Sequence, residues 1–274
     1  FEVANQSIVA LTNNNKGKPL LLLVHGWLDN AASFSALLPE LEDYYAIAID
    51  LPGHGLSSHR SPDAHYHLLD YVNDLHALVE QNHWERFSLV GHSLGGIISS
   101  IYCAAFPERV SHFVCIESAG PLTEDESSTI TQIRGSIDSR IASSAKPIKQ
   151  PKDFTSIVQA RCKVSDLSKE NASMILKRNT RELESGALEW TTDKRLRTQS
   201  SIRLTPLQAE NIVKGICCPV HIILGETGFE KVKTLLKTRL DFFENIQLTT
   251  LKGGHHVHME STDELAKIIK IHCR

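Results

Sequence analysis

The sequence predicts an α/β fold in which a mostly parallel sheet carries helices on both faces. Short apolar runs bounded by turn residues are typical of buried strands, and they occur at residues 20–24, 45–49, 87–90, 110–116, 220–224 and 246–251. Helical hydrophobic patterns lie between many of these runs, most clearly at 68–84, 94–106 and 262–272. Strands that alternate with helices place the helices over both faces of a parallel sheet.

The overall composition limits the class of protein. The chain has 274 residues, of which 41% are hydrophobic, so it can bury a substantial core as one domain, with or without an insertion. Its net charge of −3 gives no sign of a nucleic-acid partner. The longest apolar run, 20–24, is far shorter than the ~20 residues that span a bilayer. Because the chain begins at Phe1, we expect its natural start to lie further upstream, although no targeting segment is visible.

The cysteines indicate a reducing environment. No paired CxxC spacing occurs among the six, which are Cys103, Cys115, Cys162, Cys217, Cys218 and Cys273. In a chain of this length we expect reduced, mostly buried thiols and a cytoplasmic location.

A change of pattern marks an insertion in the α/β core. From residue 121 to about 206 the chain is polar and helix-rich, without a convincing strand. Isoleucines recur there at helical spacing, which favours a folded segment over a free linker, at Ile130, Ile133, Ile137 and Ile141. We therefore expect a core formed by residues 1–120 and 207–274, and a helical segment at 121–206.

The clearest functional motif is Gly91-His92-Ser93-Leu94-Gly95, which lies between an expected strand and an expected helix. This is the setting in which a G-x-S-x-G motif presents a nucleophilic serine, on a turn so sharp that its neighbours must be small. We therefore predict Ser93 as the nucleophile, with the backbone N–H of Leu94 stabilising an oxyanion at the helix N-terminus. The alternative is a tight glycine-rich turn with an incidental serine.

A second oxyanion donor is expected in His25-Gly26-Trp27, directly after the strand at 20–24. A backbone N–H at this place belongs to the usual oxyanion hole, and we assign it to Trp27. The alternative is a plain turn at the end of a strand, and His25 itself is interpreted as a structural turn residue. Asp50 and His54, in another turn after a strand, are also interpreted as structural.

A serine hydroxyl needs a base to accept its proton, and the best candidate is His255. It lies in a loop between the strand at 246–251 and the last helix, where the ends of parallel strands form sites. Gly253 and Gly254 let it turn toward the nucleophile. His256 and His258 are the alternative bases, and a metal site is the alternative use of the three histidines. We expect neither a metal nor a cofactor.

In chain order these motifs resemble the α/β-hydrolase fold family, over nearly the whole chain. The matching segments are 25–27, 50–57, 91–96 and 254–255. Residues 254–259 and 190–197 look most similar to serine hydrolase-like proteins and bacterial esterase-type hydrolases. The resemblance implies an eight-stranded, mostly parallel sheet with an inserted helical cap after the sixth strand, here residues 121–206.

The acid that orients the base departs from the common family pattern. Many relatives carry an Asp where this chain has Gly228, but some, including a subgroup of haloalkane dehalogenases, place the acid where Glu117 lies. A carboxylate that closes an apolar strand is costly to leave unpaired, which favours a partner such as His255. We therefore predict Glu117 as the acid. The alternatives are Glu226 or Glu230 as the acid, with Glu117 merely capping its strand.

Together these residues predict a serine hydrolase, in the first place a carboxylesterase that cleaves small to medium acyl esters through an acyl-enzyme. A thioesterase, lactonase, C–C bond hydrolase or cofactor-free perhydrolase would use the same residues. A haloalkane dehalogenase or epoxide hydrolase would need an Asp in place of Ser93. An alternative of a different class is a non-catalytic, ligand-binding relative, although such proteins usually lose a member of the triad. The expected partner is a small-molecule ester.

Overall fold

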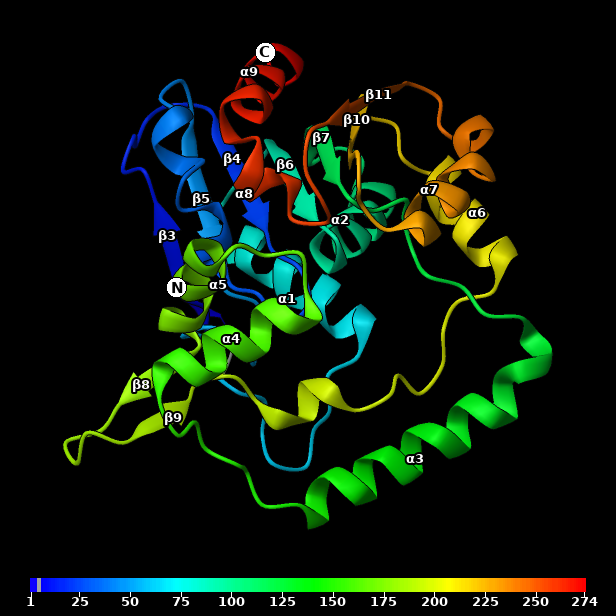
Figure 1. Cartoon of the computed structure of the whole chain (residues 1–274). Helices are drawn as coiled ribbons and strands as arrows, with labels where there is room; N and C mark the ends of the chain where they lie inside the picture. Colours follow the sequence, from blue (N-terminus) through cyan, green and yellow to red (C-terminus); the bar gives the residue numbers. More distant parts are fainter. Residues whose placement is uncertain (4–5) are drawn as a thin grey trace.

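A seven-stranded sheet forms the centre of the computed structural model, which describes residues 1–3 and 6–274 (Figure 1). The strand order is β11-β10-β7-β6-β4-β5-β3, and neighbouring strands are parallel except β3 and β5. The predicted α/β class is confirmed, and every expected strand is present. The strands are β3 (Ala10–Thr12), β4 (Leu20–Val24), β5 (Tyr45–Ile49), β6 (Phe87–His92), β7 (Val110–Ile116), β10 (Val220–Gly225) and β11 (Ile246–Leu251).

Helices cover both faces of this sheet, as the alternation of elements predicted. Those of the core are α1 (Leu68–Gln81), α2 (Leu94–Ala105), α6 (Pro206–Lys214), α7 (Glu230–Lys237), α8 (Val257–Glu260) and α9 (Thr262–His272). Short 3₁₀ helices are η1 (Ala31–Phe34), η2 (Leu38–Glu40), η3 (Glu126–Ser128), η4 (Lys194–Arg197) and η5 (Leu240–Phe242).

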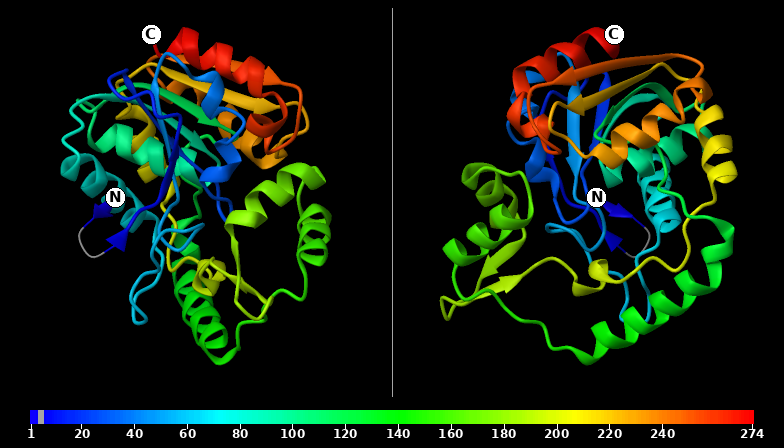
Figure 2. Two further views of the ribbon diagram at one scale, coloured as in Figure 1. Left: turned by 90° about the vertical axis from the view of Figure 1, so that its left-hand side faces the viewer. Right: turned by 45° about the vertical axis from the view of Figure 1, so that its right-hand side comes forward.

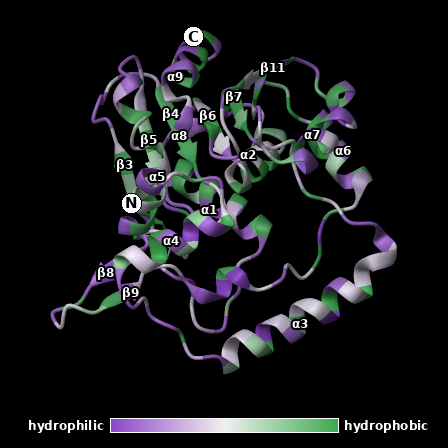
Figure 3. Cartoon of the chain, in the orientation of Figure 1, coloured by the Kyte–Doolittle hydropathy of each residue, from purple (hydrophilic) through white to green (hydrophobic). Residues whose placement is uncertain are grey.

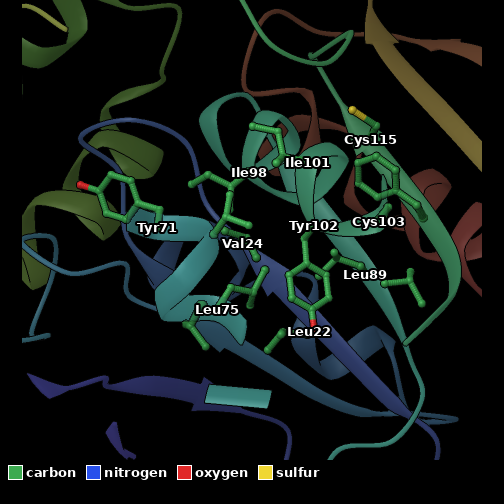
Figure 4. Packing of buried hydrophobic residues seen from close by; sticks show 14 of the residues in the cluster. Leu22, Val24, Tyr71, Leu75, Leu89, Ile98, Ile101, Tyr102, Cys103 and Cys115 are labelled. Atoms are coloured by element: carbon green, nitrogen blue, oxygen red, sulfur yellow. The ribbon is translucent and has the colours of Figure 1, made fainter. Parts of the chain in front are cut away.

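Side chains of the central strands alternate between two hydrophobic cores. On β4, Leu22 and Val24 pack into one core with side chains of α1 and α2, part of which Figure 4 shows. Leu21 and Leu23 point to the opposite face, where they pack with η1 and α9. Because side chains alternate along a strand, one continuous apolar run serves both cores.

The main sheet has seven strands in the described part of the chain, whereas the family resemblance implied eight. The N-terminal strands β1 (Glu2–Val3) and β2 (Gln6–Ser7) pair antiparallel with each other in a separate sheet. These two-residue strands pack beside α1 and do not extend the edge formed by β3.

The segment 121–206 lies outside the main sheet and has a small core of its own (Figure 2). It contains α3 (Thr129–Ala145), α4 (Phe154–Val164) and α5 (Lys169–Arg178). The expectation that it lacks strands is wrong, because β8 (Thr180–Glu182) and β9 (Leu188–Trp190) form an antiparallel hairpin. Each strand has only three residues, too few for a hydrophobic pattern to reveal it.

The isoleucines that recur along α3 lie on its exposed side. Ile130 is 74% exposed and Ile141 is 64% exposed, whereas the buried residues of the helix are Gln132 and Ser136. Gln132 Oε1 accepts a hydrogen bond from the backbone N–H of Arg203 (2.8 Å). Figure 3 shows the mixed hydropathy of this helix. The spacing therefore predicted the helix, but the side that packs is polar.

All six cysteines are free thiols in the structure, and four of them are buried. The cytoplasmic location stays a prediction. Among residues 1–3 and 6–274, no helix combines the length and the apolarity that crossing a membrane requires.

Candidate active site

Ser93 lies in a strained turn between β6 and α2. Its φ of 50° and ψ of −112° fall outside the regions that non-glycine residues normally adopt. The N–H of Ser93 donates to the carbonyl of Ile116 on β7 (2.9 Å), and its own carbonyl accepts from the N–H of Ile97 (3.0 Å). These bonds hold the sharp strand-to-helix turn that a nucleophilic serine requires.

Close backbone approaches explain the glycines around Ser93. A Cβ atom on Gly95 would overlap the carbonyl oxygen of Val24 at the end of β4. A Cβ atom on Gly91 would lie 2.6 Å from the carbonyl oxygen of Gly95. Larger residues would therefore push α2 away from the sheet and displace the turn.

The backbone N–H of Leu94 lies at the N-terminus of α2, directly after Ser93. Leu94 is the first residue of α2, and the first turn of a helix leaves its N–H groups without intrahelical partners. The positive end of the helix dipole adds to the attraction for an anion beside Ser93.

Trp27 lies in a turn at the same edge of the sheet. Strands β4 and β6 are neighbours that pair Val24 with Gly91, so the segments that follow them emerge side by side. The turn is closed by a hydrogen bond from the Asp29 N–H to the Gly26 carbonyl (3.1 Å). The Trp27 indole Nε1 donates to the carbonyl of Leu196 in η4 (2.9 Å). The turn that carries Trp27 is thus bound to the segment 121–206.

His255 and Glu117 come together although 138 positions separate them in the sequence. His255 follows β11 and Glu117 follows β7, and His255 Nδ1 lies 3.1 Å from Glu117 Oε2. Glu117 is only 1% exposed, and it also accepts hydrogen bonds from the backbone N–H groups of Gly225 (2.8 Å) and Phe229 (3.1 Å). These partners compensate the loss of water around the buried carboxylate.

Gly228 lies directly against the Glu117 carboxylate. A Cβ atom there would overlap the Glu117 carboxylate, so a side chain at this position and Glu117 compete for the same space. The alternative acids Glu226 and Glu230 are both exposed. Of the three candidates, the structure brings Glu117 to His255.

The ring of His255 is also held by an aromatic contact that sequence reasoning missed. Phe229 stacks on it with ring centroids 3.9 Å apart and an interplanar angle of 16°. The Phe229 side chain is 57% exposed, and nothing in its local pattern marks it as part of a site.

The His92 side chain links the turn of Ser93 to the loop that carries His255. His92 Nε2 lies 2.9 Å from the carbonyl oxygen of His255, and the two rings have centroids 4.9 Å apart. In the described part of the chain, no hydrogen bond joins Ser93 Oγ to His255. Such bonds are often long in free enzymes and tighten when substrate binds.

His256 is bound by carboxylates at both ring nitrogens. Its Nδ1 lies 2.6 Å from Asp166 Oδ1, and its Nε2 lies 3.3 Å from Asp29 Oδ2. Burial opposes a charge here, but the two carboxylates outweigh it and raise the pKa of His256 to about 9. His256 is therefore an imidazolium at neutral pH, and it has no lone pair with which to accept a proton.

Asp29 forms the buried centre of this ion cluster. Arg161 of α4 also contacts it, with Nη2 2.7 Å from Oδ1. Burial alone would raise the pKa of Asp29, yet His256 and Arg161 hold it well below its usual range. The cluster joins the loops that follow β4 and β11 to the segment 121–206.

The turn residues interpreted as structural are buried and bonded. His25 Nε2 accepts the N–H of Leu51 (3.0 Å), and Asp50 binds Arg178 of α5 through Nη2 (2.8 Å). Burial, assisted by repulsion from His25, lowers the pKa of His54 to about 3. These contacts hold the loops beside the site.

The three histidines after β11 thus occupy three different environments. His258 is fully buried, and burial together with repulsion from His256 lowers its pKa to about 3. Within the described residues, no group of three or more His, Cys, Asp and Glu side chains is arranged to hold a metal ion.

Comparison with known proteins agrees with this fold and with the motif order. A family model described as the α/β hydrolase fold matches residues 19–262. The chain therefore belongs to the α/β hydrolase family. The resemblance predicted from the motifs is confirmed.

Within this family the chain is similar to serine hydrolase-like proteins. It is 31% identical over 264 residues to the serine hydrolase-like protein of Danio rerio, covering 92% of this chain and 80% of that protein. It is 31% identical over 274 residues to serine hydrolase-like protein 2 of Homo sapiens, covering 93% and 86%.

Solved structures show the same fold. A hypothetical protein from Pseudomonas aeruginosa PAO1 has a TM-score of 0.91 at 31% identity and covers 98% of both chains. A thioesterase domain from the curacin biosynthetic pathway has a TM-score of 0.83 at 22% identity, covering 99% of this chain and 97% of that one. The second likeness concerns the fold alone.

Proposed function

We propose that the protein is a serine-dependent carboxylic ester hydrolase that cleaves small to medium acyl esters through an acyl-enzyme. The observation that carries the proposal is the buried Glu117–His255 pair, at the same edge of the sheet as the strained turn of Ser93. A hydroxyl nucleophile, a base and a carboxylate that orients the base are the groups that acyl transfer requires.

In the proposed reaction His255 accepts the proton of Ser93 as Oγ attacks the ester carbonyl carbon. The N–H groups of Trp27 and Leu94 stabilise the negative oxygen of the tetrahedral intermediate. The His255 imidazolium then protonates the leaving alcohol, which yields the acyl-enzyme. In the second half His255 removes a proton from water, the water attacks the acyl group, and Ser93 is regenerated with release of the acid.

Glu117 acts through His255 in this scheme. Its bond to Nδ1 keeps the proton on that nitrogen and leaves Nε2 free to serve as the base. The carboxylate also stabilises the imidazolium that forms during both steps.

We also propose that residues 121–206 act as a cap on a core formed by 1–120 and 207–274. The segment contacts loops at the carboxyl edge of the sheet, where Asp166 binds His256 and Arg178 binds Asp50. A cap at this edge would shape the acyl site and limit the access of water.

A substrate panel on wild type and Ser93→Ala tests the proposal. We expect release of p-nitrophenol from esters between acetate and laurate, fastest at short and medium chain lengths. We expect Ser93→Ala to lose ~10⁴-fold or more in kcat, as nucleophile removal does in other serine hydrolases. If a thioester or lactone of the same acyl group is cleaved much faster, that compound class would replace esters as the proposed substrate. Absence of all turnover would favour a ligand-binding protein.

A further inference from the structure

A cavity of about 770 Å³ lies between the segment 121–206 and the turn after β4. Residues of α3, α4, α5 and η4 line it, and Leu28 forms part of its wall on the side of the core. Ser93 and His255 are not among the lining residues. The volume is within the range of sites that bind small molecules.

Five cationic side chains lie among the largely apolar and neutral residues that line this cavity. They are opposed by a single acidic residue, Asp193, which Arg195 already neutralises at 2.7 Å. This local excess contrasts with the net charge of −3 of the whole chain. The cations are Lys146, Lys149, Arg161, Lys194 and Arg197.

Not all of these cations are engaged by the protein. Arg161 pairs with Asp29, and Lys194 Nζ donates to the carbonyl oxygens of Ser143 (2.9 Å) and Lys146 (2.8 Å). Across residues 1–3 and 6–274, no carboxylate oxygen lies within 4.0 Å of the charged groups of the remaining three, which are Lys146, Lys149 and Arg197.

Arg197 lines the cavity together with Arg161, and its side chain is still accessible to solvent. Partial burial, together with repulsion from Arg161, lowers the pKa of Arg197. A bound anion would offset both effects because it replaces lost solvation and opposes the like charge.

The cavity adjoins the turn that carries the proposed oxyanion donor. Arg197 follows Leu196, whose carbonyl accepts the hydrogen bond from the Trp27 indole. Leu28, the next residue after Trp27, lines the cavity directly. Apolar side chains also line the cavity, among them Ile157, Val164 and Leu176.

We propose that this cavity binds an anionic group, a carboxylate, phosphate or sulfate, carried by the ester that Ser93 attacks. Arg197 supplies the principal contact, and the apolar wall accommodates the chain that links the anion to the ester. The inference rests on the proposed function, since it names the substrate class of the same site.

Two esters that differ by one charge test whether the cavity binds an anionic group of the substrate. The p-nitrophenyl monoester of glutaric acid carries a free carboxylate, whereas its methyl ester is neutral and nearly the same shape. We expect wild type to prefer the charged ester by at least about tenfold in kcat/KM, equivalent to one charge-assisted contact. Added salt should reduce this preference, because it screens the attraction.

Substitutions of Arg197 test whether the preference for the charged ester arises from the cavity. Arg197→Gln should lose most of the preference, because kcat/KM should fall much more for the charged ester than for the neutral ester, and Arg197→Lys should keep part of the preference. The matched control is Arg181→Gln, because Arg181 pairs with Glu189 on the β8–β9 hairpin and does not line the cavity. Equal rates on both esters in wild type, or equal losses on both in Arg197→Gln, would overturn the proposal.

A binding measurement separates this inference from the proposed function. The monoanilide of glutaric acid keeps the carboxylate but contains an amide in place of the reactive ester. Calorimetry should detect its binding to Ser93→Ala, and the Arg197→Gln substitution in that background should weaken it about tenfold. Binding that depends on Arg197, without any ester turnover, would support the anion site and contradict the esterase. Ester turnover without such binding would support the esterase and contradict the anion site.

Discussion

Two adjacent histidines, His255 and His256, both contact carboxylates, but His255 contacts one and His256 contacts two. His255 binds Glu117 through Nδ1, and its ring is otherwise covered by Phe229. His256 binds Asp166 and Asp29, one at each ring nitrogen. One carboxylate orients an imidazole and leaves its second nitrogen free, whereas two carboxylates fix it as a cation.

The difference separates the proposed base from a structural ion pair. His256 keeps its proton at neutral pH and joins the segment 121–206 to the core through Asp166 and Asp29. Among the described residues, His255 has a single carboxylate partner, Glu117, at Nδ1, and it is the base in the proposed reaction. Neighbouring residues of one type thus take different tasks because their partners come from different parts of the chain.

The largest expected effect comes from removing either histidine and comparing the rates. His255→Gln should lower kcat by ~10⁴-fold or more, as loss of the base does in serine hydrolases. His256→Gln should lower it far less, because His256 touches neither Ser93 nor the leaving group in the proposed reaction. Steady-state hydrolysis of p-nitrophenyl butyrate measures both. If His256→Gln were the more damaging change, the two roles would have to be exchanged.

The next effect concerns the carboxylate of His255. Glu117→Gln should reduce kcat by ~10²–10⁴-fold with a similar fold, because the amide favours the wrong tautomer and cannot stabilise the imidazolium. Glu226→Gln is the matched control, since Glu226 is exposed, and it should leave kcat unchanged. The opposite pattern would move the acid to the loop after β10. Circular dichroism checks that both variants are folded.

The ion pair of His256 should appear as a pH dependence of stability. Its pKa is raised from 6.5 to about 9 in the folded protein, so its contribution is fully present below about pH 6.5 and is lost as the pH rises through 9. The size is about 3 kcal/mol in the free energy of unfolding, from ~1.4 kcal/mol per pKa unit. Urea unfolding between pH 6 and 10 measures it.

The matched control for this measurement is the exposed residue His67, changed to Gln. His67→Gln should follow the wild-type curve. His256→Gln should be less stable at neutral pH and should lose the decline between pH 6.5 and 9. A wild-type curve that is flat over this interval, or a variant that keeps the decline, would contradict the ion-pair role.

The smallest effect concerns the stacked ring beside the base. Phe229→Leu keeps the backbone N–H that Glu117 accepts but removes a contact worth ~0.5–1.5 kcal/mol, so kcat/KM should fall a few-fold. Phe242→Leu, in η5, is the control and should not change the rate. A rate for Phe229→Leu that equals wild type would show that the stacking does not position His255.

Local patterns in the sequence were sufficient for every strand of the main sheet except the edge strand β3, which has only three residues, and for the turns that follow those strands. Strand β7 could be bounded from its apolar run, and the turn at Ser93 from its glycines and its position between strand and helix. Such features depend on neighbouring residues alone. The position of Glu117 needed a family resemblance in addition, because nothing local pairs it with His255.

Features that depend on distant residues could not be predicted. Asp166 reaches His256 in the loop after β11, and Arg161 reaches Asp29 in the turn after β4, only because the segment 121–206 folds back onto the core. The isoleucines of α3 predicted a helix but not the side that packs, since Gln132 finds polar partners on another loop. The hairpin β8–β9 is too short for a pattern of alternating side chains.

The central claim, that Ser93 is a nucleophile activated by the folded site, is tested most directly with a fluorophosphonate reagent. Intact mass spectrometry should show a single adduct on the folded wild type, and peptide mapping should place it on Ser93. Ser93→Ala and urea-unfolded wild type should remain unmodified. A folded wild type that stays unlabelled, or an adduct on another residue, would contradict the claim.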